Sequence, residues 1–469
     1  MKVYAKALML VSLIFWHSLL HAALLPVVED ALKTAGIAQS GVAVYVQAVD
    51  SEQPLYTQNA SLAMNPASVM KLVTTYTSLD MLSPAYRWKT EVYREGELSN
   101  GVLNGNLILK GYGDPSFKAQ QFWSLLMRLQ QAGIKQIKGN LIIDKTAFAE
   151  NVGQRETFDE ETWRAYNASP TAFLVNGRNT SFRFSVVGGQ VLVDQEFALP
   201  EVSIINKMKL RDGVCGSWRD YFNYDVVPKL NGAVVTFTGA YATDCGERYL
   251  ELSVMDDTQY AYATFKKLWA ELGGKFSGKL QVTAMPDTAL KVLEQESDPL
   301  GYVVRDINKW SNNLMARQLL LSLALEQKLT PANEALGTQA LKAWLSSKGL
   351  NFNEMVIENG SGLSRIERIS AQHLGQMLVS AYRSPVMPEL LSSLPIVGLD
   401  GTAKKRLKDA QVSGRAHIKT GSLNGVSAIA GYILSAQGKR YVVVMIVNDG
   451  NAAASKKAQD ALMEQVYLN

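Results

Sequence analysis

The stretch NPASVMK at residues 65–71 runs directly into LVTTYTSLDML at residues 72–82. The second part carries apolar residues at helical spacing, which predicts a helix. Pro66 suits the beginning of that helix, because its missing N–H would have no partner there in any case. Residues three apart share one helix face, so Lys71 can reach the hydroxyl of Ser68. The stretch therefore predicts an activated serine at the beginning of a helix.

The chemistry of lysine sets a condition on the surroundings of this serine. A serine hydroxyl is a weak nucleophile and needs a neighbouring base, and Lys71 can be that base only after its ammonium group loses a proton. Burial and a second nearby cation both lower the pKa of a lysine, and we expect Lys419 to be that cation. The beginning of the helix also directs the N–H of Ser68 toward a developing oxyanion.

A second short motif, Ser311-Asn312-Asn313, is separated from Lys71 by 239 residues. We expect the Ser311 hydroxyl to relay a proton to the leaving amine, and the Asn313 amide to bond both Lys71 and the substrate backbone. The pattern alone is weak, because Ser-x-Asn also occurs at residues 422–424. Its meaning comes from its place between two other motifs.

The third motif, Lys419-Thr420-Gly421-Ser422, has the character of an edge strand. We expect Lys419 and Thr420 to receive a terminal carboxylate, and Gly421 to let the substrate backbone approach closely. The N–H of Ser422 would complete an oxyanion hole with that of Ser68. A Lys in a strand is ordinarily a solvated residue, so this assignment depends on the other two motifs.

Other catalytic schemes find less support in the sequence. Four His occur; two lie in the first 21 residues, which leaves His373 and His417 for a Ser-His-Asp triad. No Gly-x-Ser-x-Gly elbow is present to carry that triad, and we interpret His417 as a structural or rim residue. Nothing singles out a pair of carboxylates for glycoside chemistry. Because the chain has two Cys and no His cluster, we expect neither a metal site nor a cofactor.

The N-terminus has the pattern of a secretory signal peptide. Lys2 and Lys6 form a positive region, residues 7–20 are apolar, and Ala22 and Ala23 offer a cleavage site. A membrane anchor is the alternative, but the apolar stretch is shorter than the roughly 20 residues of a spanning helix. We expect export with residues 1–23 removed, and at most a peripheral contact with a membrane.

Length, charge and cysteine content limit the class of protein further. A chain of 469 residues is too long for one compact core, so we expect two or three domains. The formal charge of +4 falls to +2 without the two lysines of the signal, which argues against nucleic-acid binding. In an exported protein Cys215 and Cys245 most simply form a disulfide, with two free buried thiols as the alternative.

The middle of the chain, from about residue 88 to residue 285, consists of short strands with Gly and Asn turns. A helix–strand unit at residues 121–143 is followed by a similar unit at residues 262–282, which predicts an α/β lobe. Residues 168–244 would emerge between the two units as a β-rich lobe. Chance similarity between two amphipathic segments is the alternative to an internal repeat.

The two ends of the chain predict a single sheet. After a short helix at residues 27–35, residues 42–48 alternate like a strand, with a return partner near residues 54–56. From residue 290 onward we expect helices, followed by strands and a last helix. These later segments are helices at residues 334–348 and 370–382, strands at residues 416–420, 426–434 and 440–447, and a helix from residue 454. We therefore expect an antiparallel sheet built from both chain ends.

In the order Ser-x-x-Lys, Ser-x-Asn, Lys-Thr-Gly, the three motifs match the signature of serine β-lactamases and penicillin-binding proteins. Over most of its length the chain resembles the class C low-molecular-mass penicillin-binding proteins, which are D-alanyl-D-alanine carboxypeptidases and endopeptidases. Further matching segments are Pro66-Ala67-Ser68, Gly113-Asp114-Pro115, residues 144–148, Gly360-Ser361-Gly362-Leu363-Ser364-Arg365, Leu394-Pro395, Asp400-Gly401-Thr402 and Ala430-Gly431-Tyr432. One departure is Asn359, which stands where the resemblance leads us to expect Asp, so this position does not carry the expected carboxylate.

The resemblance implies an α+β fold. A penicillin-binding transpeptidase-like (serine β-lactamase-like) domain, with an antiparallel sheet flanked by helices, would comprise residues 24–87 and 287–469. An α/β lobe at residues 88–165 and 246–286 and a β-rich lobe at residues 166–245 would be inserted between the first two motifs. Simple β-lactamases join these motifs by a short helical stretch, so the long separation favours the class C family.

The resemblance also implies an activity in the periplasm. Ser68 would attack the penultimate D-Ala of peptidoglycan peptides, the terminal D-Ala or a crosslinking amine would leave, and water would hydrolyse the acyl-enzyme. β-lactam antibiotics would acylate the same serine. Asp144 resembles a family position that contacts the amine of a diaminopimelyl side chain, but it can equally be a turn or cap residue. The alternatives are a β-lactamase or esterase on the same fold, and a wall-binding scaffold with a vestigial site.

Overall fold

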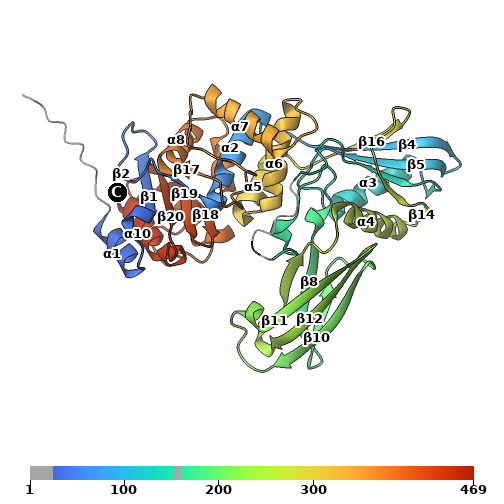
Figure 1. Cartoon of the computed structure of the whole chain (residues 1–469), viewed down its shortest axis with the longest axis horizontal. Helices are drawn as coiled ribbons and strands as arrows, with labels where there is room; N and C mark the ends of the chain where they lie inside the picture. Colours follow the sequence, from blue (N-terminus) through green and yellow to red (C-terminus); the bar gives the residue numbers. More distant parts are fainter. Residues whose placement is uncertain (1–24, 153–158, 160) are drawn as a thin grey trace, which may run out of the picture.

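The computed structural model describes residues 25–152, 159 and 161–469 (Figure 1). The expected signal peptide at residues 1–23 lies outside the described residues. Among the residues that are described, no helix has the length and apolar character needed to cross a bilayer.

A five-stranded antiparallel sheet joins the two ends of the chain, with the strand order β18-β19-β20-β1-β2. Its strands are β1 (Val42–Ala48), β2 (Tyr56–Gln58), β18 (Ala416–Leu423), β19 (Val426–Leu434) and β20 (Arg440–Asn448). Figure 1 shows the first strands, in blue, lying among the last strands, in red. The sheet expected from both chain ends is therefore present.

Helices cover both faces of this sheet, which explains its unbroken apolar strands. Val443 and Val447 face the helices α1 (Pro26–Thr34) and α10 (Lys456–Leu468), whereas Val444 packs in the same core as the other helices. Successive side chains of a strand point to opposite faces, so a strand covered on both sides is apolar throughout. The second group of helices is α2 (Lys71–Leu82), α5 (Leu300–Trp310), α6 (Asn313–Glu326), α7 (Glu334–Ser347), α8 (Ala371–Tyr382) and α9 (Met387–Ser393).

A seven-stranded sheet and two helices form the α/β part of the insertion. The helices are α3 (Ala119–Gln131) and α4 (Asp257–Glu271), and the strands are β4 (Lys89–Ser99), β5 (Val102–Gly111), β6 (Gln136–Ile137), β7 (Leu141–Asp144), β14 (Lys275–Phe276), β15 (Leu280–Val282) and β16 (Leu290–Glu296). The two helix–strand units of the expected repeat meet directly, because β14 pairs with β6 and β15 pairs with β7, both in parallel.

Two three-stranded sheets form the β-rich part, drawn in green in Figure 1. Their strands are β8 (Thr180–Val187), β9 (Gln190–Gln195), β10 (Val202–Arg211), β11 (Phe222–Lys229), β12 (Gly232–Ala242) and β13 (Arg248–Leu252). Phe184 and Phe237 pack between the sheets with their ring centroids 5.1 Å apart. The expected disulfide is present between Cys215 and Cys245, whose Cα atoms are 4.5 Å apart.

Two segments differ from the sequence expectation. Residues 290–296, where we expected helical structure, form β16 and pair with β4 at the edge of the seven-stranded sheet. Opposite charges also face each other across this pairing, since Lys291 lies 2.8 Å from Glu91 and Lys89 lies 3.4 Å from Glu294. Similarly, β13 pairs with β8 and extends the β-rich part beyond residue 245. We keep the division into a split catalytic domain and two inserted lobes as a proposal, with these two strands reassigned.

Candidate active site

Ser68 lies in a tight 3-10 turn, Ala67–Met70, that leads into α2. Ala67 adopts the left-handed conformation, with φ at 47°, which a non-glycine residue holds only when its surroundings impose it. Those surroundings include Asn65, whose Oδ1 atom accepts from the N–H of Ala67 at 2.9 Å. Gly362 packs so closely that a Cβ atom built on it would lie 1.9 Å from the carbonyl oxygen of Ala67.

Lys71 is completely buried one turn beyond this serine. Its Nζ atom lies 3.0 Å from Ser68 Oγ and 2.6 Å from Asn313 Oδ1, and it also donates to the carbonyl oxygen of Ser361. The structure thus brings the first residue of α6 to the first residue of α2, as expected from the motifs. Ser361 was not among the expected site residues.

Lys419, on β18, contacts the second serine of the constellation rather than the first. Its Nζ atom lies 2.8 Å from Ser311 Oγ and 2.7 Å from the carbonyl oxygen of Thr420. Ser311 ends α5 in the left-handed conformation, at φ 58° and ψ 41°. That turn directs the chain from α5 into α6 and presents the Ser311 hydroxyl to β18.

Burial perturbs both lysines in the same direction. It lowers the pKa of Lys419 to about 7. It also lowers the pKa of Lys71 well below its usual range; the charge of Lys419 adds to this effect and the carboxylate of Glu367 opposes it. Both physical causes expected from the sequence, burial and a second cation, therefore act on Lys71. A lysine with a lowered pKa can hold a neutral amine near neutral pH and serve as a base.

The strand β18 lies close against the turn that carries Ser68. A Cβ atom built on Gly421 would lie 2.8 Å from the carbonyl oxygen of Pro66 and 3.0 Å from the N atom of Ser68. The absence of a side chain at Gly421 allows this approach. The oxyanion hole expected from the N–H groups of Ser68 and the exposed Ser422 stays a prediction. The hydroxyl of Thr420 lies 2.8 Å from that of Thr402, in the Asp-Gly-Thr segment that precedes the strand.

The loop after α7 supplies a residue that sequence reasoning missed. Glu367 is completely buried, and its Oε1 atom accepts three backbone N–H groups, from Glu358, Asn359 and Gly360, at 2.9–3.1 Å. Burial raises the pKa of this carboxyl. The sequence pointed to this loop only indirectly, because Asn359 stands where we expected an Asp. Asn359 itself bonds within the loop, accepting from Ser361 N at 2.9 Å and donating to the carbonyl oxygen of Leu363 at 2.9 Å.

Asp144, expected as a substrate contact, is engaged in other bonds. Its carboxylate accepts from the N–H and hydroxyl of Thr146 and from the N–H of Met285, and lies 3.1 Å from Lys110 Nζ. The residue is 1% exposed. Its role in binding an amine stays a prediction, and these bonds do not favour it.

The two histidines outside the N-terminal segment bond residues other than Ser68. His417 Nδ1 lies 3.1 Å from the carbonyl oxygen of Leu391, and His373 Nδ1 lies 2.7 Å from Glu354. Neither therefore forms the Ser-His contact that a triad needs. Among the described residues, no group of three His, Cys, Asp or Glu is placed to hold a metal ion.

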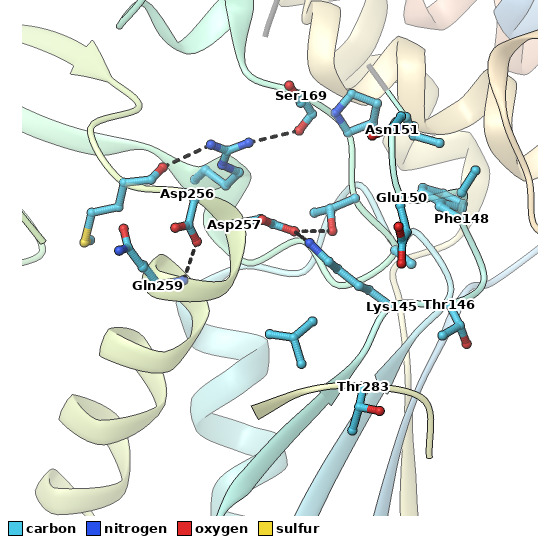
Figure 2. A pocket seen from close by; sticks show the side chains of 18 of the residues that line it. Lys145, Thr146, Phe148, Glu150, Asn151, Ser169, Asp256, Asp257, Gln259 and Thr283 are labelled. Carbon is cyan, nitrogen blue, oxygen red and sulfur yellow. Dashed lines mark hydrogen bonds and ion pairs between the residues drawn. The ribbon is translucent and has the colours of Figure 1, made fainter. Parts of the chain in front are cut away.

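Two cavities border the insertion, and only one reaches the site. A cavity of about 700 Å³ extends from Ser311 and Asn313 to Lys118, Arg164 and Arg219. A second cavity, of about 850 Å³, is lined by none of the five residues expected to be catalytic (Figure 2). Three of its polar groups bond one another, because Lys145 Nζ and Thr171 Oγ1 lie 2.9 and 2.6 Å from Asp257 Oδ2.

Comparison with known proteins places this geometry in context. The profile of the D-Ala-D-Ala carboxypeptidase 3 (S13) family matches residues 24–467. The D-alanyl-D-alanine carboxypeptidase DacB of Haemophilus influenzae is 26% identical over 415 residues, which are 87% of this chain and 85% of that protein. The D-alanyl-D-alanine carboxypeptidase of an Actinomadura species is also 26% identical, over 91% of this chain and 80% of its own length.

The fold has a counterpart among solved structures. The crystal structure of penicillin binding protein 4 (dacB) from Haemophilus influenzae superposes with a TM-score of 0.78 at 25% sequence identity. The match covers 94% of this chain and 99% of that one, so it spans both the sheet built from the two chain ends and the long insertion.

Proposed function

Because the chain belongs to the D-Ala-D-Ala carboxypeptidase 3 (S13) family, we propose that it is a serine peptidase that removes the terminal D-alanine from peptidoglycan stem peptides. The relatives named as D-alanyl-D-alanine carboxypeptidases support this reaction. The observation that carries the proposal is the contact between Lys71 Nζ and Ser68 Oγ at 3.0 Å, with Asn313 joining the same nitrogen from a distant segment.

The first half of the reaction forms an acyl-enzyme on Ser68. The neutral amine of Lys71 takes the proton of Ser68 Oγ as that oxygen attacks the carbonyl carbon of the penultimate D-Ala. The N–H groups of Ser68 and Ser422 stabilise the oxyanion. When the intermediate collapses, the C–N bond breaks and the terminal D-Ala leaves as an amine, after receiving a proton through Ser311.

The second half releases the peptide. Water attacks the ester carbon and passes a proton to Lys71 as the base, so Ser68 is restored as a hydroxyl and the peptide leaves as a carboxylic acid. Both halves use the same amine, which therefore has to cycle between its neutral and charged forms. A pKa lowered by burial supports that cycle.

Lys419 and Thr420 are proposed to hold the terminal carboxylate of the substrate. The contacts of Lys419 Nζ in the described part of the chain are a hydroxyl and a carbonyl oxygen, so a substrate carboxylate would be its first anionic partner. Binding an anion raises a lysine pKa. The substrate would therefore stabilise the charged form of Lys419 that recognises it.

We extend the proposal to endopeptidase action on crosslinked peptides. In that reaction the leaving amine belongs to a second stem peptide, which needs room beyond Ser311. The cavity of about 700 Å³ that continues from Ser311 to Arg164 and Arg219 supports this extension. The expected signal peptide supports action in the periplasm, after export.

A fluorescent penicillin tests the proposal, because a β-lactam amide acylates the same serine and mimics the first half-reaction. We expect stable labelling of the wild type, loss of labelling in Ser68→Ala, and normal labelling in Ser61→Ala, which changes an exposed serine. Rapid release of the label would favour a β-lactamase instead. Absence of labelling would favour a non-catalytic wall-binding protein.

Mass spectrometry of muropeptides separates the two activities. Incubation of a crosslinked dimer with the enzyme gives loss of one D-Ala for carboxypeptidase action and two monomers for endopeptidase action. We expect both products. Loss of D-Ala alone would contradict the endopeptidase extension and leave the carboxypeptidase proposal intact.

A further inference from the structure

We propose that Glu367 is a positioning residue for the reaction: its carboxylate holds the loop at residues 358–361 so that the Ser361 carbonyl oxygen meets Lys71 Nζ. This inference rests on the proposed function, because it takes Lys71 as the base. It assigns a task to a buried acid that none of the three motifs includes.

The bonds of the Glu367 carboxylate show how it shapes the loop. Its Oε1 atom accepts the N–H of three consecutive residues, Glu358 at 3.1 Å, Asn359 at 3.0 Å and Gly360 at 2.9 Å. Three N–H groups converge on one oxygen only if the backbone curls around it. Hydrogen bonds to a charged carboxylate are stronger than those to a neutral acceptor, although an amide oxygen at the same place can accept the same N–H groups.

The curled loop turns its carbonyl oxygens toward α2. The carbonyl oxygen of Gly360 accepts from Thr74 Oγ1 at 2.6 Å, and the carbonyl oxygen of Ser361 accepts from Lys71 Nζ. Gly362, which follows Ser361, packs against Ala67, the residue before Ser68. One carboxylate therefore supports contacts with both the base and the turn that carries Ser68.

The second carboxylate oxygen has a different environment. Glu367 Oε2 is buried and has no hydrogen-bond partner within the described residues. A buried charge with an unpaired oxygen is costly unless an opposite charge is near. The charged groups that act on Lys71 are Lys419 from β18 and Glu367 from this loop, while Ser68 and Asn313 are neutral partners. Glu367 thus offsets the effect of Lys419 on the base.

The loop also explains the departure at Asn359. The side chain there accepts from Ser361 and donates to the carbonyl oxygen of Leu363, and only an amide can do both. An Asp at this position would face the Leu363 carbonyl oxygen without a proton to donate. Asn359 therefore bonds within the loop as a neutral amide, while the Glu367 carboxylate accepts its backbone N–H.

Two conservative variants distinguish the effect of the side-chain length of Glu367 from the effect of its charge. Glu367→Gln keeps an oxygen at the same distance but removes the charge, so we expect the acidic limb of the penicillin acylation rate to move to lower pH by about one unit. The maximal rate should stay within about threefold. Glu367→Asp keeps the charge but shortens the side chain. We therefore expect the acidic limb of the acylation rate to stay at the same pH and the maximal acylation rate to fall about tenfold. Asp114→Asn, which removes another buried carboxylate, should leave the limb in place.

An unchanged acidic limb in Glu367→Gln, or a wild-type rate in Glu367→Asp, would overturn the proposal. If Glu367→Gln does not fold, the acylation rate of Glu367→Asp decides the question, provided that this variant has the thermal stability of the wild type. A titration of Lys71 by ¹³C-lysine NMR, assigned with Lys71→Arg, reads the pKa of the base without any substrate. A wild type that takes up no penicillin would therefore overturn the proposed function, while the NMR shift in Glu367→Gln would still decide the role of Glu367.

Discussion

At the residue scale, the partners of a buried lysine separate the two lysines that we propose to be catalytic from a structural one. Lys309 is 3% exposed and lies 2.6 Å from the partly exposed carboxylate of Asp400, so it forms an ordinary ion pair. Lys71 and Lys419 are 0% exposed, and the partners that the structure gives their Nζ atoms are hydroxyl, amide and carbonyl oxygens. Burial without a contacting carboxylate lowers a lysine pKa, which suits a residue that exchanges protons.

The first prediction concerns the pH dependence of Lys419. Its pKa of about 7 is lowered, so its charged form is lost as pH rises through that value, and with it the attraction for a substrate carboxylate. We expect kcat/KM for a D-Ala-D-Ala peptide to fall above about pH 7. In Lys419→Arg, whose guanidinium stays charged, the descending limb should disappear at the cost of a lower maximum. The same descending limb in both proteins would contradict this role.

The second prediction concerns Gly362, at φ 79°. A Cβ atom there would lie 1.9 Å from the carbonyl oxygen of Ala67, so Gly362→Ala should lower the free energy of unfolding by about 2–4 kcal/mol and slow acylation of Ser68. Gly349→Ala is the matched control, because Gly349 has φ at 73° but nothing within 4 Å of the added atom. We expect it to cost only about 1 kcal/mol and leave acylation unchanged. Urea unfolding measures the free energy of unfolding of both variants, and penicillin labelling measures their acylation. Equal losses in Gly362→Ala and Gly349→Ala would contradict a role for close packing at Gly362.

At the scale of elements, α6 connects the site to the insertion. Its first residue, Asn313, bonds Lys71, and five residues later Gln318 reaches into the insertion. The Gln318 side chain is completely buried, accepts from Thr171 N at 2.9 Å, and donates to the carbonyl oxygens of Thr171 at 2.9 Å and Gly113 at 3.2 Å. One amide therefore satisfies backbone groups of two loops that would otherwise be buried without partners.

The third prediction follows from these bonds. Gln318→Leu has a similar size but leaves the Thr171 N–H and two carbonyl oxygens unpaired, so we expect a loss of about 2–4 kcal/mol in the free energy of unfolding. Gln327→Leu, at the exposed end of the same helix, should change it by less than about 0.5 kcal/mol. Urea denaturation followed by tryptophan fluorescence compares the two. Similar small effects would show that the insertion docks without this amide.

At the scale of the whole molecule, the insertion carries its own stabilising crosslink. Cys215 and Cys245 enclose a separation of 30 residues within the β-rich part, next to a core that includes Phe184, Phe237 and Tyr241. The site residues come from other sheets and helices. Loss of the crosslink should therefore affect the β-rich part first.

The fourth prediction tests this separation. Cys215→Ala/Cys245→Ala should lose about 3 kcal/mol in the β-rich part, because the unfolded chain gains the freedom of a loop of that length. We expect calorimetry to show an earlier transition for this part, while penicillin labelling at 25 °C stays at the wild-type level. Reductant should lower the wild-type transition in the same way and leave the double variant unchanged. Loss of labelling in the folded double variant would mean that the crosslink supports the site itself.

The sequence alone determined the local features of this protein. Apolar segments of strand length located β1 and β20, and helical spacing located α8, because these patterns depend on a few neighbouring residues. The contact of Ser68 with Lys71 was also predictable, since residues three apart share one face of a turn. The joining of both chain ends in one sheet was expected and is present.

Tertiary structure decided which distant groups meet. It places Lys419 next to Ser311, and it brings Glu367 and Ser361 close to Lys71. It also bonds the Asp144 carboxylate to Lys110 and Thr146. It also makes residues 290–296 an edge strand through antiparallel pairing with β4, because a segment of seven residues has no decisive period of its own. The physical reason is that local pattern sets the shape of a segment, whereas the contacts between different segments are set by how those segments pack.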